Sequence, residues 1–157
     1  RFSATKRSYI YNILNGPTPS ALWADRSLFI PIRLDIQSMK KASKYLIGEH
    51  DFSSFRGSGC QSKTPIRNIQ AIKISRKDDF VTLEFTANAF LLHMVRIIVG
   101  TLIMVGKKEI QPKEVDKILK QKNRKIAGKT VNSSGLFFLG PCYPKKYKVP
   151  EFNNNLI

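Results

Sequence analysis

A single arginine occupies the most apolar stretch of this sequence. Arg96 lies in the run FLLHMVRIIVGTL, and its helical neighbours there, such as Leu92 and Val99, supply no carboxylate. A buried guanidinium without a partner costs several kcal/mol. We therefore expect an acidic partner that arrives through the fold or from a segment absent from this chain, and a missing catalytic carboxylate would fit. Alternatively, the stem of Arg96 is buried and its charged end reaches solvent.

The helical spacing predicts that Arg96 shares one face with Ala89, His93 and Gly100. The small residues at the two ends of this face would let another backbone or a flat base approach closely. His93 would contribute to such a site, or it is a core histidine whose hydrogen bonds are satisfied within the protein.

Two tyrosines follow two basic residues near the start of the chain. Tyr9 and Tyr11 point to the same face of a strand, and Lys6 and Arg7 precede them. Aromatic rings beside basic side chains grip single-stranded bases through stacking and phosphate contact. The alternative is that both tyrosines belong to the core of a sheet.

A glycine- and serine-rich loop, SFRGSGCQSKTPIRN, carries three further cations, Arg56, Lys63 and Arg67. Its backbone N–H groups could face phosphates, although a solvated basic loop would have the same composition. The sequence contains no phosphate-binding P-loop, no GxGxxG, no Ser/His/Asp set and no metal-ligand cluster. The residues alone therefore indicate a basic RNA-binding domain without an assigned reaction.

The composition fits one globular domain with a polyanionic partner. The 157 residues are 42% hydrophobic, and 27 Lys and Arg against 11 Asp and Glu give a net charge of +16. An anionic membrane surface is the less favoured partner, because the most apolar predicted helix is also the least charged. We expect RNA or DNA.

Three features of the sequence indicate the surroundings in which the chain works. Cys60 and Cys142 show no zinc or disulfide spacing, which fits a reducing cytoplasm. The apolar run 90–105 is shorter than the roughly 20 residues of a membrane span, so we expect a buried helix and no membrane insertion. Because the chain opens on Arg1 with no leader, we expect it to begin inside a longer protein.

The patterning predicts strand, helix, hairpin, two helices and strand, in that order. We expect Asp35 and Asn88 to cap the first two helices, Gly48 to end the first one, and the loop 51–65 to lie at the surface. The expected ranges are strands at 7–14, 66–76, 80–87 and 135–140, and helices at 36–47, 89–105 and from 112. This order predicts an α+β fold with helices packed on a mostly antiparallel sheet.

Four blocks, RFSATKRSYIY, LIGEHDFSSFRGSGCQSKTPIRNI, ANAFLLHMVRIIVGTLIMVG and SGLFFLGPCYP, resemble in order and spacing the C-terminal half of TruA-type tRNA pseudouridine synthases. The resemblance implies a pseudouridine synthase fold and isomerisation of uridine in the anticodon stem-loop of tRNA. It also implies a homodimer that uses no cofactor and no metal and flips the target base. In this family the nucleophile is an aspartate in a GRTDxG motif, which this chain lacks. Residues 1–157 would be the C-terminal α/β domain, with the N-terminal domain missing.

The resemblance also assigns residues. Tyr9 would stack on the target base and take a proton, Arg96 would pair with the catalytic aspartate and keep it ionised, and Leu136 would wall the pocket. The run AGKTVNSS departs from the family pattern before Gly135. Contact with the RNA backbone is expected for Arg1, Lys6, Arg7, Arg56, Lys63 and Arg67. The alternatives are a non-catalytic RNA-binding domain and, ranked last, a structural protein of a ribonucleoprotein particle.

Overall fold

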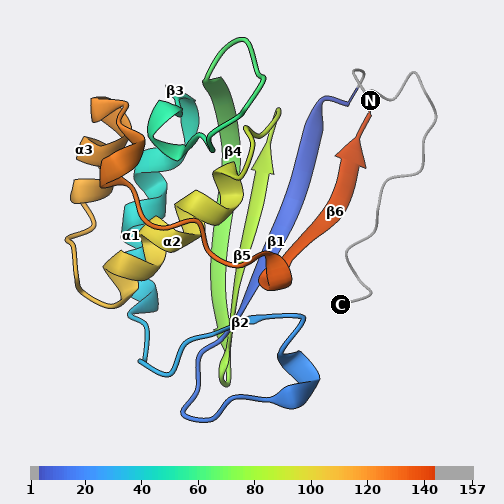
Figure 1. The fold of residues 1–157 in the computed structure, drawn as a ribbon, viewed down its shortest axis with the longest axis vertical. Helices are drawn as coiled ribbons and strands as arrows, with labels where there is room; N and C mark the ends of the chain where they lie inside the picture. The colour runs from blue at the N-terminus through green and yellow to red at the C-terminus, as the bar shows by residue number, and fades with distance from the viewer. Residues whose placement is uncertain (1–3, 144–157) are drawn as a thin grey trace.

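The computed structural model describes residues 4–143, which form one six-stranded sheet. The order across the sheet is β2-β1-β5-β4-β3, and β6 pairs with β1 on the edge opposite β5. Every pairing is antiparallel except the short β1–β2 pair. The strands are β1 (Lys6–Leu14), β2 (Leu28–Phe29), β3 (Gly48–Asp51), β4 (Ile66–Lys77), β5 (Phe80–Ala87) and β6 (Leu136–Cys142) (Figure 1).

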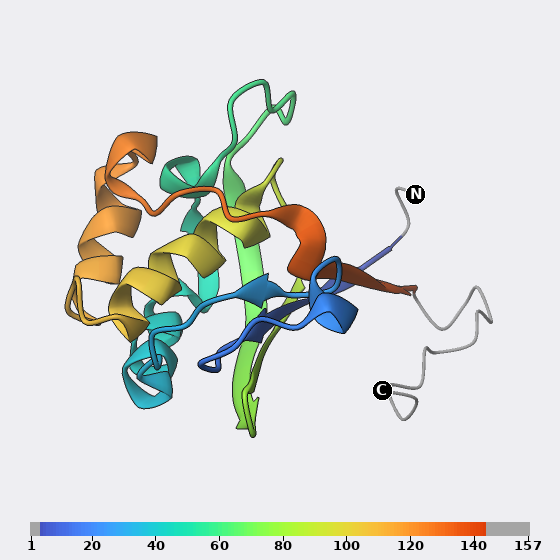
Figure 2. The same cartoon turned by 60° about the horizontal axis from the view of Figure 1, so that its bottom comes forward.

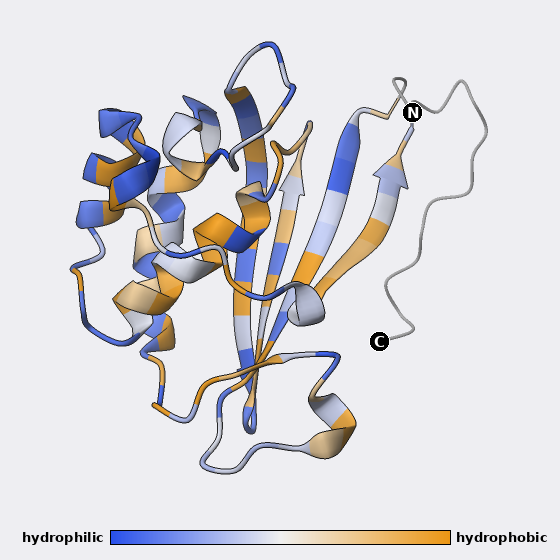
Figure 3. Cartoon of the chain, in the orientation of Figure 1, coloured by the Kyte–Doolittle hydropathy of each residue, from blue (hydrophilic) through white to orange (hydrophobic). Residues whose placement is uncertain are grey.

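Three helices, α1 (Ile36–Ser43), α2 (Met94–Gly106) and α3 (Glu114–Gln121), lie on the same side of the sheet (Figure 2). The predicted α+β architecture is confirmed. The predicted inner face of β5, with Val81, Leu83 and Phe85, is completely buried. Figure 3 shows α2 as the most apolar helix, and nearly all of its residues are buried. Full burial contributes about 1.5–3 kcal/mol for each large apolar side chain.

The first predicted helix is shorter than its apolar pattern suggests. Asp35 caps α1 as predicted, because its carboxylate accepts a hydrogen bond from the Ser38 N–H at 3.0 Å. The α-helix ends at Ser43 and continues as a 3-10 turn, so the predicted extension to residue 47 is wrong. Gly48 adopts a φ of +103° and begins β3, a strand that the sequence did not predict.

The predicted start of the second helix is also wrong. The Asn88 side chain does not cap a helix; its Oδ1 accepts hydrogen bonds from the backbone N–H groups of Asn68 and Ala89. Residues 90–93 run irregularly, His93 adopts a left-handed φ of 58°, and α2 begins only at Met94. Ala89 therefore lies outside the helix, and His93 is exposed rather than a core histidine.

The loop 51–65 is not wholly a surface segment, contrary to the prediction. Phe52 and Phe55 are completely buried, and the hydroxyl of Ser54 donates to the Ile118 carbonyl of α3 at 2.6 Å. These contacts attach one end of the loop to the core, whereas residues 58–64 remain largely exposed. Within residues 4–143, no helix has the length and apolar character needed to cross a membrane.

Candidate active site

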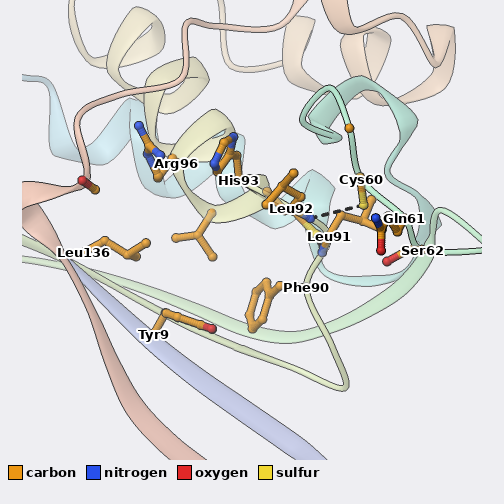
Figure 4. A pocket seen from close by; sticks show the side chains of 14 residues that line it. Tyr9, Cys60, Gln61, Ser62, Phe90, Leu91, Leu92, His93, Arg96 and Leu136 are labelled. Atoms are coloured by element: carbon orange, nitrogen blue, oxygen red, sulfur yellow. Dashed lines mark hydrogen bonds between the residues drawn. The ribbon is translucent and has the colours of Figure 1, made fainter.

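A cavity of about 930 Å³ opens beside β1, the start of α2 and the start of β6. Tyr9, Arg96 and Leu136 line it, each from a different one of these elements. Figure 4 shows the three side chains around one end of the cavity, while Cys60, Gln61 and Ser62 lie at the other end. The fold therefore brings together three residues that are far apart in the sequence.

Tyr9 is held by aromatic neighbours rather than by hydrogen bonds. Its ring meets Phe90 edge-on at a centroid distance of 5.2 Å and Phe138 at 5.0 Å. These contacts fix the plane of the ring. In the described part of the chain its hydroxyl has no hydrogen-bond partner, so Tyr9 differs from the fully buried Tyr11 two residues later.

Arg96 is half-buried, and the fold supplies it with a carbonyl instead of a carboxylate. Its Nε donates to the Val131 carbonyl at 2.6 Å. Among residues 4–143 its η nitrogens take part in no ion pair or hydrogen bond. The expected acidic partner of Arg96 is therefore not supplied by the described residues, and the terminal nitrogens are available to another group.

The orientation of Arg96 depends on residues 127–132, which we call the strap. The Gly128 N–H donates to the Thr101 hydroxyl at 2.9 Å. A Cβ atom on Gly100 would stand 2.0 Å from the Lys129 carbonyl oxygen, so only glycine permits this approach to α2. Tyr11 donates to the Asn132 carbonyl at 2.5 Å, and burial raises the pKa of Tyr11 to about 12 against a smaller opposing effect of the Arg96 charge.

The loop 57–62 forms the other end of the cavity and is pinned to the segment that precedes α2. The Gly57 N–H donates to the Leu92 carbonyl at 2.9 Å, and the Leu92 N–H lies 3.5 Å from the Cys60 sulfur. Burial opposes ionisation of the thiol, but hydrogen bonds from Leu92, Ser62 and Arg56 outweigh it and lower the pKa of Cys60 to about 7.

The predicted RNA-contacting cations fall into two groups. Lys6 and Lys63 are exposed, whereas Arg56 donates to the Cys60 and Ser62 carbonyls, both at 2.7 Å. Arg67 donates to the Thr64 and Ile66 carbonyls, and burial lowers its pKa. Arg7 donates to the Asn88 carbonyl at 2.7 Å, and Arg1 lies outside the described residues. Arg56 and Arg67 therefore stabilise the conformation of the loop through these hydrogen bonds.

Sequence reasoning missed the lining residues Phe90, Gln61 and Leu92. Phe90 and Leu92 look like ordinary helix residues in an apolar run, and only the delayed start of α2 turns them toward the cavity. A signal was available for Gln61, because it lies in the glycine-rich loop already selected for its cations. Residues 4–143 contain no group of three or more His, Cys, Asp or Glu placed to hold a metal ion.

Comparison with known proteins identifies the family to which this chain belongs. The family described as tRNA pseudouridine synthase matches residues 42–144. The chain is 44% identical to tRNA pseudouridine synthase A of Hydrogenovibrio crunogenus over 96% of its own length and 58% of that protein. The corresponding protein of Nitrosomonas eutropha is 39% identical over 98% of this chain and 55% of its own length. The corresponding protein of Dechloromonas aromatica is 38% identical over 100% of this chain and 60% of its own length.

The chain thus spans somewhat more than half the length of these curated relatives. The matched region, residues 42–144, includes α2 with Arg96 and the first strand residue of β6, Leu136. The predicted resemblance is confirmed, and the chain belongs to the tRNA pseudouridine synthase family.

Proposed function

We propose that this chain forms one wall of the active site of an enzyme that isomerises uridine to pseudouridine in the anticodon stem-loop of tRNA. The observation that supports this best is the convergence of Tyr9, Arg96 and Leu136 on one cavity. A flat ring, a cation and an apolar side chain are the groups needed to stack a base, orient an anionic nucleophile and exclude water.

In the proposed reaction, the aspartate attacks C1′ of the ribose as the bond to N1 of uracil breaks, the detached base turns, and C5 then displaces the aspartate from C1′ to form the new carbon–carbon bond. C5 loses its proton and N1 gains one, and the proposed role of the Tyr9 hydroxyl is to relay this proton, taking it from C5 while passing its own on. Arg96 holds the attacking aspartate ionised through its free η nitrogens. Leu136 lines the pocket beside the base.

The aspartate itself comes from a part of the longer protein outside this chain. Two observations support this: residues 1–157 contain no GRTDxG motif, and the relatives are longer than the matched region. The proposal therefore assigns residues 1–157 to the C-terminal domain of the synthase and predicts that this chain is inactive by itself.

The remaining parts of the proposal rest on the family resemblance. The longer enzyme would act as a homodimer in the cytoplasm and would need no cofactor. Lys6, Arg7, Arg56, Lys63 and Arg67 would contact the RNA backbone, together with Arg1. The net charge of +16 supports tRNA as the partner, since Lys and Arg side chains that neutralise phosphates release counterions.

The test is to incubate an unmodified tRNA transcript with the longer protein and to map pseudouridine by carbodiimide modification and primer extension. We expect new stops within the anticodon arm. If the transcript is bound but no stop appears, the activity is refuted and an RNA-binding domain without catalysis is the remaining function.

A further inference from the structure

The cavity continues beyond the residues that the proposed function uses. Its volume is about 930 Å³ with this chain alone as its wall. Tyr9, Arg96 and Leu136 surround only one end of it (Figure 4). The other end lies between residues 59–62 and residues 91–92 (Figure 4). The proposed function uses the first end and leaves the second without an occupant.

Hydrogen bonds within the protein fix the wall of the second end. Arg56 bonds two carbonyls of the 59–62 segment, and the Gly57–Leu92 and Leu92–Cys60 contacts join this loop to the segment before α2. The wall therefore needs little ordering when a ligand binds, which saves conformational entropy.

The side chains at this end combine apolar contact with hydrogen-bonding capacity. Leu92 is 43% exposed although it is a large apolar residue. Gln61 is exposed, and within residues 4–143 its amide has no hydrogen-bond partner. An amide carries both donors and an acceptor, which suits the edge of a nucleobase. Lys63, also exposed, follows two residues later and supplies positive charge for a phosphate.

We propose that Gln61 and Leu92 form a flanking subsite that binds the base of the nucleotide next to the target uridine. The inference rests on the proposed function, because it takes the Tyr9 end as the place of the target base. Adjacent nucleotides are covalently joined, so the neighbour of a base at Tyr9 must lie close to it. The continuous cavity and the cationic loop make this end the complementary position for that neighbour.

The experiment uses the longer protein and three anticodon stem-loop RNAs: an unaltered one and two that lack the base either 5′ or 3′ of the target. KM for isomerisation and the equilibrium Kd are measured for each. Loss of one neighbouring base should raise KM and Kd of the wild-type protein about tenfold, since a base contact is typically worth this much. The double variant Gln61→Ala/Leu92→Ala should already show this roughly tenfold rise in KM and Kd with the unaltered RNA. Removing the neighbouring base should then change its KM and Kd little.

Gln70→Ala/Leu22→Ala is the matched control, because both residues are exposed and lie outside the cavity. It should behave like the wild type, and circular dichroism checks that each variant is folded. If Gln61→Ala/Leu92→Ala still distinguishes the RNAs as the wild type does, the subsite is refuted. If the wild type binds but isomerises none of the RNAs, the proposed function fails, and the Kd values alone decide whether the subsite exists.

Discussion

Arg96 places a half-buried charge in an otherwise apolar helix. Only its Nε has a partner among residues 4–143, and that partner is a backbone carbonyl. A cation that is held by a carbonyl at one end and lines the cavity is suited to position an incoming carboxylate, because charge-assisted hydrogen bonds fix both distance and direction. Arg96 is thus the residue on which the proposed chemistry depends most.

We predict that Arg96→Met in the longer protein lowers kcat about 100- to 1000-fold, the usual effect of removing one preorganised charge-stabilising donor. Affinity for tRNA should change little, since one cation among 27 is lost. Steady-state kinetics and filter binding measure the two effects. Arg33→Met is the control, because among residues 4–143 the Arg33 side chain takes part only in an exposed ion pair with Asp79. Equal turnover in the two variants would refute the role of Arg96.

Tyr9→Phe separates stacking from proton transfer, because it keeps the ring contacts with Phe90 and Phe138 and removes only the hydroxyl. If the hydroxyl accepts the proton, kcat should fall about 100-fold or more while Kd for tRNA is retained. Tyr45→Phe, at an exposed tyrosine outside the cavity, should be neutral. Full activity of Tyr9→Phe would leave stacking as the only role of this residue.

At the scale of elements, the site depends on how closely the strap crosses α2. Gly100→Ala adds a methyl group that meets the Lys129 carbonyl of the strap, and neither backbone can yield locally. We expect a loss of about 1–3 kcal/mol in the free energy of unfolding, although alanine is the better helix former. In the control Gly106→Ala, the nearest atom is the sulfur of the flexible Met39 side chain, so the loss should be smaller. Urea unfolding compares the two, and equal losses would contradict this account of the strap.

The Tyr11 hydroxyl makes the same strap sensitive to high pH. The pKa of Tyr11 is raised from 10.0 to about 12 on folding, so the folded state keeps this proton longer than the unfolded state. The stability that this contributes is complete below pH 10 and is lost as the pH rises through about 12. Over this window the wild type should lose about 2–3 kcal/mol more than Tyr11→Phe. Urea unfolding, followed by the fluorescence of the single tryptophan Trp23, measures the free energy of unfolding of both proteins. Equal losses of stability in the two proteins between pH 10 and pH 12 would contradict the raised pKa of Tyr11.

Elements whose apolar residues recur at a regular spacing could be predicted from the sequence. Elements whose bounds are set by tertiary contacts could not. Strand β5 is found at its predicted bounds, because alternation of apolar residues reports one buried face directly. The late start of α2 depends on hydrogen bonds between the segment 90–93 and a loop more than thirty residues earlier, which no local pattern contains. The two-residue strand β2 is likewise too short for any period.

The residues of the candidate site were likewise predictable from the sequence only in part. Arg96 is conspicuous by itself, since a charge in an apolar run demands an explanation. The residue pattern selected Tyr9 and Tyr11 alike, and only the resemblance separated Tyr9 from the buried Tyr11 and pointed to Leu136, because tyrosine and leucine on strands are ordinary core residues. The contribution of the 57–62 loop became evident only when its contacts with Leu92 placed it beside the cavity.

At the scale of the whole molecule, this strongly basic chain is proposed to form one wall of a larger site. Its charge of +16 suits a tRNA partner, and one face of its sheet is covered by helices while β6 forms an edge next to the cavity (Figure 1). The proposed enzyme is complete only when another part of the longer protein brings a carboxylate to Arg96.

The most direct test of this claim is the release of tritium from tRNA labelled at C5 of uridine, because forming the new carbon–carbon bond expels that atom. The longer protein and this chain alone are compared at equal concentration. We predict release by the longer protein and none by residues 1–157 alone. Release by this chain alone would contradict a nucleophile located outside it, and the absence of release by the longer protein would contradict the proposed reaction.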